Sequence, residues 1–290
     1  MQGLHILVTG AQGQVGNELQ VLAKNYPDNQ WLFTDYTELD ITNKDMVKTF
    51  FEQQQFDYCI NCAAYTAVDK AEQEPEKAAA INVEGVKNLA LACQTAATRL
   101  LHISTDYVYH NSQNTPFKET DATSPQSVYG QTKLSGELEA ATVLKEMITV
   151  RTSWVYSSFG NNFVKTMLRL GTEREQLSVI FDQIGSPTYA RDLAQVLLDI
   201  IIHKEKHKEE AFAGVYHYSN EGVCSWYDFA HAIFEHKAIV CQLLPIETKD
   251  YPTPAKRPPF SLLNKAKIKA DFDLAIPHWR ESLYTCLELL

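Results

Sequence analysis

The chain has 290 residues, of which 45% are hydrophobic and 21% charged. This composition is typical of a folded globular protein and excludes extended disorder. The length allows one large unit or two domains. The formal net charge of −10 argues against nucleic acid or an anionic membrane as the main partner. A small anionic ligand stays compatible with it, because a local site can be positive inside an acidic protein.

The segment from Met1 to Val8 lacks the basic start and the long apolar core of a signal peptide. The sequence contains no run of the roughly 20 apolar residues that would span a bilayer. We therefore expect a cytoplasmic protein. Cys59 and Cys62 form a C-x-x-C in a strand-like segment, where residues three apart point to opposite faces. We expect no redox or zinc site there, and all six cysteines reduced.

Strand-like and helix-like segments alternate through the first half of the chain. The expected strands are His5–Thr9, Trp31–Asp35, Tyr58–Ala63, Arg99–Ser104 and Met147–Arg151. The expected helices are Gln14–Lys24, Asp45–Gln54, Glu76–Ala97 and one that begins near Tyr129 and is completed by Gly136–Leu144. Short connections between such segments indicate a parallel sheet wound by crossover helices. The nearly uninterrupted apolar runs suit strands that are covered on both faces.

A glycine-rich loop joins the first strand to the first helix, with the pattern G-x-x-G-x-x-G. Glycines allow a tight turn and a close approach of backbone N–H groups to a pyrophosphate, and the helix N-terminus adds partial positive charge. The strand before the loop and the helix after it are the context that this mechanism requires. We therefore predict an α/β fold with a Rossmann-type doubly wound sheet that binds NADH or NADPH. The expected cofactor-binding residues of the loop are Gly10, Gln12, Gly13, Gln14, Val15 and Gly16.

The end of the second strand bears on the choice of cofactor. Asp35 lies there, where a carboxylate can accept hydrogen bonds from both adenosine ribose hydroxyls and would repel a 2′-phosphate. The glycine loop has no Arg or Lys that could pair with such a phosphate. Asp40 and Ile41 are expected nearer to the adenine. The pattern favours NADH and leaves NADPH open.

Tyr129 and Lys133 stand four residues apart at the start of the expected fourth helix, so they share one face. A tyrosine has a reference pKa of about 10, and a neighbouring ammonium favours its anion. The phenol can then give a proton to a carbonyl oxygen as hydride arrives at the carbon. Ser104 and Thr105 end the fourth strand, at the sheet edge where open α/β folds bind ligands. We expect one of these two hydroxyls to form the catalytic group with Tyr129 and Lys133.

Beyond about residue 152 the regular alternation is lost, and segments rich in aromatic residues and proline appear, such as Ser225–Tyr227 and Pro252–Pro259. We expect a dinucleotide-binding domain over residues 1–152. Residues 153–290 would form mainly a smaller, less regular substrate-binding domain, with some segments returning to the sheet. The nine histidines show no metal-ligand spacing, and we expect no metal site.

With these motifs in place, the sequence resembles the extended short-chain dehydrogenases/reductases and, within them, the dTDP-4-dehydrorhamnose reductase family. The resemblance covers nearly the whole chain. The matching segments are Gly10–Gly16, Asn61–Glu72, Ile81–Asn82, His102–Tyr109, Tyr129–Lys133, Arg151–Tyr156, Asn161–Val164, Asp182–Thr188 and Gly222–Tyr227. It implies reduction of the C4 ketone of dTDP-4-dehydro-L-rhamnose to dTDP-L-rhamnose.

The resemblance also implies roles for individual residues. Tyr129 would be the proton donor, Lys133 would lower its pKa and hold the nicotinamide ribose, and Thr105 would hydrogen-bond the reacting oxygen. Further cofactor contacts would come from Ala63, Ala64 and Tyr65, and substrate contacts from Thr105, Asp106, Trp154, Asn162 and Arg257. The family commonly has Arg-Pro-x-Asn-Ser near its C-terminal end, and this chain has Phe260 in place of the Asn. Phe260 cannot make the amide contacts of that Asn, while Arg257 stays a candidate partner for the substrate diphosphate.

Two other functions stay open at this point. The regulatory subunit of methionine adenosyltransferase resembles the same reductases and acts as a binding partner, although the intact catalytic group favours an enzyme. The chain could also be a reductase or an epimerase for another nucleotide-linked sugar. A homodimer is a further hypothesis.

Overall fold

The computed structural model describes residues 3–290, with a six-stranded sheet at its centre. All pairings within this sheet are parallel, and the strand order is β10-β5-β4-β3-β1-β2. Its strands are β1 (His5–Thr9), β2 (Gln30–Thr34), β3 (Tyr58–Asn61), β4 (Arg99–Thr105), β5 (Met147–Thr152) and β10 (Gly214–Tyr218). Met1 and Gln2, which belong to the segment without signal-peptide features, lie outside the described residues.

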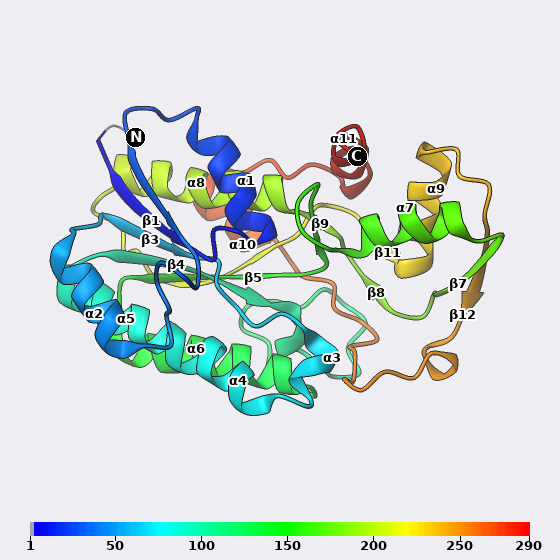
Figure 1. Ribbon diagram of the computed structural model, residues 1–290, viewed down its shortest axis with the longest axis horizontal. Helices are drawn as coiled ribbons and strands as arrows, with labels where there is room; N and C mark the ends of the chain where they lie inside the picture. Colours follow the sequence, from blue (N-terminus) through cyan, green and yellow to red (C-terminus); the bar gives the residue numbers. More distant parts are fainter. Residues whose placement is uncertain (1–2) are drawn as a thin grey trace.

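Helices cover both faces of the sheet (Figure 1). One face carries α1 (Gln14–Ala23) and α8 (Ala190–Lys206), and the other carries α2 (Lys44–Gln53), α5 (Val86–Ala96) and α6 (Val128–Val143). The strand periodicity explains this, because alternate residues point to opposite faces. Ile6 and Val8 lie in one buried cluster with residues of α8, whereas Leu7 lies in a second cluster with residues of α2 and α5.

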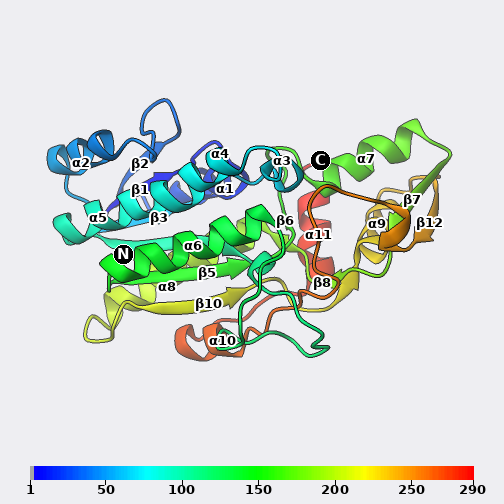
Figure 2. The same cartoon turned by 90° about the horizontal axis from the view of Figure 1, so that it is seen from below.

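The later part of the chain contributes to the sheet and also forms a separate packed region. There α7 (Phe163–Glu173), α9 (Trp226–His236) and α11 (Trp279–Leu287) enclose a third apolar cluster, at the end of the molecule opposite to α2 (Figure 2). The short strands of this half form three two-stranded pairs. They are β6 (Val155–Tyr156) with β9 (Thr188–Tyr189), β8 (Ile184–Gly185) with β11 (Cys224–Ser225), and β7 (Gln176–Ile180) with β12 (Gln242–Ile246). Shorter helical elements include α3 (Val68–Ala71), α10 (Ala266–Phe272), and the 3₁₀ turns η2 (Asp106–Val108) and η3 (Thr248–Asp250).

The expected α/β fold with a doubly wound parallel sheet is confirmed. Two elements differ from the expected ones. The edge strand β10 was not among the expected strands. The single helix expected over Glu76–Ala97 is divided into α4 (Pro75–Ala79), a π-helical turn η1 (Ala80–Gly85) and α5. Within that turn the buried Asn82 binds the backbone of Tyr65, through bonds of 2.9 and 3.2 Å that local helix propensity does not encode. The domain boundary at residue 152 stays a prediction. Within residues 3–290, no helix is long and apolar enough to cross a membrane.

Candidate active site

A cavity of about 730 Å³ lies at the carboxyl edge of the parallel strands. Open α/β sheets bind ligands at this edge, because several loops meet there. Its lining comes from the glycine loop, from the ends of β3, β4 and β5, from the start of α6 and from the segment before α7. The residues are Gly10, Gln12–Val15, Asp35, Tyr36, Leu39–Thr42, Cys62–Ala64, Thr66, Val68, Ile81, Ile103–Tyr107, Tyr129, Lys133, Thr152, Trp154, Val155, Gly160–Asn162 and Trp226.

The glycine loop needs its glycines for different reasons. Gly10 has φ +66° and lies so close to the backbone of Ala63 that an added Cβ would be 2.6 Å from its nitrogen. Gly16 would place a Cβ 2.5 Å from the Gly10 carbonyl oxygen, so it allows α1 to pack against the loop. The N-terminus of α1 has no side-chain cap. Its amide groups therefore remain suited to an anionic ligand, with the helix dipole adding to the attraction.

The Asp35 carboxylate lies directly after β2, beside the glycine loop. It accepts hydrogen bonds from the backbone nitrogens of Gln12 at 2.9 Å and Tyr36 at 2.8 Å. The Glu38 carboxylate in turn accepts a hydrogen bond from the Asp35 backbone nitrogen at 3.0 Å. Two acidic groups therefore lie next to the glycine loop, where a dinucleotide would place its adenosine ribose.

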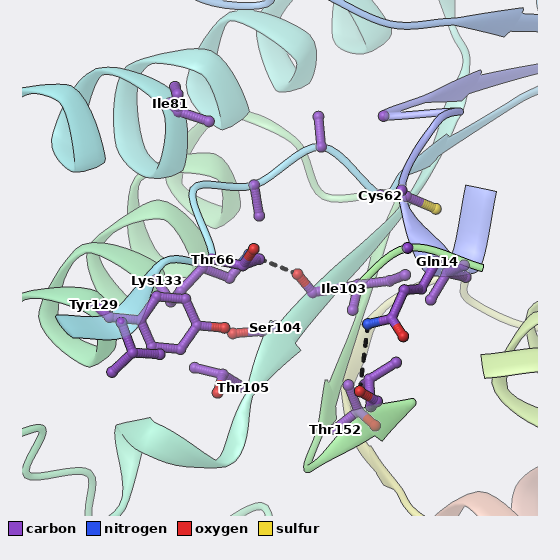
Figure 3. A pocket seen from close by; sticks show the side chains of 18 of the residues that line it. Gln14, Cys62, Thr66, Ile81, Ile103, Ser104, Thr105, Tyr129, Lys133 and Thr152 are labelled. Atoms are coloured by element: carbon purple, nitrogen blue, oxygen red, sulfur yellow. Dashed lines mark hydrogen bonds between the residues drawn. The ribbon is translucent and has the colours of Figure 1, made fainter. Parts of the chain in front are cut away.

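Tyr129, Lys133 and Thr105 come together between α6 and β4 (Figure 3). Ser127 caps α6 by accepting a hydrogen bond from the Gly130 nitrogen at 3.1 Å, and this fixes where the helix begins. Lys133 is only 2% exposed, and its ammonium donates to the Ile103 carbonyl oxygen at 2.7 Å. Thr105 follows at the end of β4, beside the Tyr129 phenol.

Burial is the largest cause of the pKa shifts of Tyr129, Lys133 and Asp106. It raises the pKa of Tyr129 to about 12, and the Thr105 hydroxyl acts in the opposite direction. Burial lowers the pKa of Lys133 to about 8, while the charge of Glu137 opposes this. Burial also raises the pKa of Asp106 to about 6, against hydrogen bonds from Ser261 and Thr105. One Asp106 carboxylate oxygen is buried without a hydrogen-bond partner, which agrees with a readily protonated acid.

The opposite wall of the cavity is built by two indoles and an amide network. Trp154 and Trp226 stack with ring centroids 3.6 Å apart, and Trp154 adopts φ +49°, in the left-handed region. Asn162 caps α7 and donates to the Gln14 side-chain oxygen at 2.9 Å. Gln14 also donates to the Val155 carbonyl oxygen at 3.3 Å. The glycine loop is thus tied directly to the segment before α7.

A family model described as the RmlD substrate binding domain matches residues 4–290. The dTDP-4-dehydrorhamnose reductase of Aggregatibacter actinomycetemcomitans is 44% identical over 284 residues, which are 96% of this chain and 96% of that protein. The chain belongs to the dTDP-4-dehydrorhamnose reductase family.

Solved structures agree with this membership. The dTDP-4-dehydrorhamnose reductase of Clostridium acetobutylicum superposes with a TM-score of 0.93 at 41% identity, covering 99% of both chains. The Bacillus anthracis reductase, determined in complex with NADP, superposes with a TM-score of 0.92 at 37% identity and covers 100% of both chains. The fold and the family inferred from the sequence are confirmed.

Most of the site residues expected from the sequence line the one cavity. They are Gly10, Gln12, Gly13, Gln14, Val15, Asp35, Asp40, Ile41, Ala63, Ala64, Thr105, Asp106, Tyr129, Lys133, Trp154 and Asn162. Gly16, Tyr65 and Arg257 are not among the lining residues. Gly16 packs under the loop, and the Tyr65 hydroxyl donates to Glu74 at 2.9 Å. Arg257 forms a two-pronged ion pair with Asp69, with nitrogen–oxygen distances of 3.0 and 2.7 Å.

The expected effect of Lys133 on the pKa of Tyr129 stays a prediction. Burial raises the pKa of Tyr129 to about 12, against a hydrogen bond from Thr105. The Lys133 ammonium is bonded to the Ile103 carbonyl, so its charge is directed toward β4 as well as toward the cavity. A protonated Tyr129 at neutral pH suits a proton donor.

Several lining residues were not found from the sequence. Trp226, which was not among the expected site residues, lines the cavity beneath Trp154. Tyr107 lies edge-on to Tyr129 with ring centroids 5.4 Å apart, and Tyr36 follows Asp35. Tyr36 and Tyr107 could have been found from the sequence, because each lies shortly after the end of a strand. No such sequence signal existed for Trp226, because it reaches the cavity from α9, which is distant in the sequence.

Proposed function

We propose that this chain reduces the C4 ketone of dTDP-4-dehydro-L-rhamnose to dTDP-L-rhamnose, with NADH or NADPH as the reductant. The observation that carries the proposal is the meeting of Thr105, Tyr129 and Lys133 in a cavity that the glycine loop also lines. Family membership supplies the class of substrate. Curated relatives of 44% and 42% identity carry the reductase name, and a homologous structure contains NADP.

The residues present fit a dinucleotide. Gly10, at φ +66°, lets the loop turn tightly against the backbone of Ala63, and the N-terminus of α1 has no side-chain cap to compete with a phosphate. Ala63 and Ala64 line the next part of the cavity without bulky side chains. We therefore propose that the pyrophosphate lies against residues 10–15 and that the nicotinamide extends toward Lys133.

The proposed chemistry assigns each catalytic side chain one task. When bound, the dinucleotide supplies a hydride to the ketone carbon. Tyr129, protonated at neutral pH because burial raises its pKa to about 12, donates a proton to the ketone oxygen. The Thr105 hydroxyl donates a hydrogen bond to that oxygen and orients it. The Lys133 ammonium stabilises the phenolate that Tyr129 leaves behind until a proton is regained.

We further propose that NADH is preferred over NADPH. Asp35 and Glu38 lie at the expected position of the adenosine ribose, and Lys133 is the one cation among the described residues that line the cavity. The division into residues 1–152 for the dinucleotide and 153–290 mainly for the substrate also belongs to the proposal. The homodimer and the cytoplasmic location stay predictions.

The direct test follows the absorbance at 340 nm after enzymatically generated dTDP-4-dehydro-L-rhamnose is added to the protein with NADH or NADPH. Loss of absorbance, with dTDP-L-rhamnose identified by NMR, would support the proposal. Absence of oxidation with both reductants, despite measurable cofactor binding, would reject it. Conversion without net use of cofactor would indicate an epimerase. Stable co-purification with an adenosyltransferase, without ketone reduction, would indicate the partner function.

A further inference from the structure

A third polar residue shares the face of α6 that carries Tyr129 and Lys133. Glu137 follows Lys133 by four residues, as Lys133 follows Tyr129, so the three side chains lie in one row. Glu137 is only 4% exposed. A carboxylate buried to this degree requires compensation, because transfer of a charge from water into the protein interior is costly.

Both oxygens of the Glu137 carboxylate accept hydrogen bonds. Arg151 of β5 binds it with three nitrogen–oxygen contacts of 3.0, 3.1 and 2.6 Å. The Ser104 hydroxyl donates to the same carboxylate. Ser104 lies between Ile103, whose carbonyl accepts the Lys133 ammonium, and Thr105, the expected ligand of the ketone oxygen. Glu137 therefore anchors the stretch of β4 on which the catalytic group depends.

The polar network continues away from the cavity through Tyr109 and His217. The His217 side chain can only donate through Nδ1 to the Phe117 carbonyl oxygen at 3.1 Å, since a carbonyl cannot donate. Its Nε2 then accepts from the Tyr109 hydroxyl at 2.8 Å, because burial lowers the pKa of His217 to about 3 and keeps the ring neutral. Tyr109 in turn accepts from Arg151 at 2.6 Å. Arg151 is thus oriented from both sides.

From this geometry we propose that Glu137, oriented by Arg151, is a positioning residue that holds the end of β4 and keeps the Lys133 ammonium charged. The inference rests on the proposed reductase function for its catalytic consequence. Stability alone is a weak reason for such a pair, because well-packed apolar residues often replace a buried ion pair at no cost. Its place directly behind Lys133 on the same face of α6 gives the pair a functional explanation.

The other groups around Lys133 do not supply the same charge. Burial lowers the pKa of Lys133 to about 8, and Glu137 is the largest charge that acts against this. Cys62 acts in the same direction, but burial raises the pKa of its thiol far above neutrality. Burial keeps His102 of β4 neutral by lowering its pKa. The remaining titratable groups at this end of the cavity are Tyr129 on α6 and both Asp106 and Tyr107 of η2.

The test measures the titration of Lys133 directly, by NMR of protein labelled with ¹⁵N-lysine, with the Lys133 signal assigned from its loss in Lys133→Met. Glu137→Gln removes the charge but keeps an acceptor for Ser104. Glu137→Gln/Arg151→Gln removes both charges, so that no buried cation is left unpaired. Glu137→Asp retains the negative charge. Glu205→Gln is the matched control, because Glu205 pairs with Arg99 at the start of β4, at the opposite edge of the sheet.

We expect the pKa of Lys133 to fall by about one pH unit or more in Glu137→Gln and in the double variant. It should stay near the wild-type value in Glu137→Asp and in the control. At pH 8 the charged fraction would then fall from about a half to about a tenth, and kcat/KM about fivefold, with the alkaline limb of the profile shifted by the same amount. An unchanged Lys133 titration in the double variant would overturn the inference. The NMR readout needs no turnover, so failure of the reductase proposal would appear separately in the 340 nm assay.

Discussion

The choice between NADH and NADPH can be tested by neutralising one side chain at the adenosine end of the cavity. The Asp35 carboxylate is held in place by two backbone N–H groups, from Gln12 and Tyr36. Asp35→Asn keeps an oxygen that can accept from Gln12 and removes the charge. We expect the wild-type protein to favour NADH and Asp35→Asn to lose most of that preference.

The expected size follows from electrostatics. A 2′-phosphate with roughly 1.5 negative charges at about 5 Å from a carboxylate is repelled by about 1–2.5 kcal/mol, for effective dielectric constants of about 80 to 40. This corresponds to a preference of about 5- to 70-fold for NADH. Glu38, bonded to the Asp35 backbone nitrogen at 3.0 Å, adds a second repulsion. Asp35→Asn/Glu38→Gln should therefore move the preference further toward NADPH than Asp35→Asn alone.

The assay compares kcat/KM for the two reductants at 340 nm and their dissociation constants by nicotinamide fluorescence. The difference should shrink as salt is added, because exposed charges are screened. Glu52→Gln is the control, since Glu52 pairs with Lys48 on the exposed surface of α2. A wild-type preference for NADPH, or a preference unchanged by Asp35→Asn, would refute the electrostatic explanation.

Three further predictions concern the catalytic and substrate ends of the cavity. Tyr129→Phe should lower kcat by about 10²- to 10⁴-fold with cofactor affinity nearly unchanged. The control Tyr26→Phe should leave both kcat and cofactor affinity unchanged. Retained turnover in Tyr129→Phe would exclude Tyr129 as the proton donor. Burial raises the folded-state pKa of Asp106 to about 6, so its contribution to stability is present below about pH 4 and lost as the pH rises through 6. Asp106→Asn should therefore gain roughly 3 kcal/mol in urea unfolding at pH 7.5 and little at pH 4; an equal gain at both would contradict the raised pKa. Arg257→Ala should raise KM for the nucleotide sugar about tenfold with a smaller change in kcat, and an unchanged KM would leave Arg257 as a partner of Asp69 alone.

Local sequence was sufficient for five of the six strands of the sheet and for much of the site; β10 was not among the expected strands. The strand and helix periods and the glycine loop are encoded by residues within one turn or one strand of each other. The four-residue interval from Tyr129 to Lys133 needs only a helix to become a shared face. Thr105 and Asp35 could be expected at the same edge because parallel strands end together. The π-helical turn at Asn82 was missed, because its stabilising contacts come from outside the helix.

The sequence by itself determined the fold class, the family and most of the residues that meet at the carboxyl edge of the sheet. Tertiary structure decided the partners of those residues. Arg257 lies 188 positions from Asp69, yet the two form an ion pair, and the Trp154 indole is stacked on Trp226 at the start of α9. The direction of the Lys133 ammonium and the role of Glu137 likewise depend on β4 and β5. Burial and long-range pairing set these properties, and neither follows from the spacing of residues along the chain.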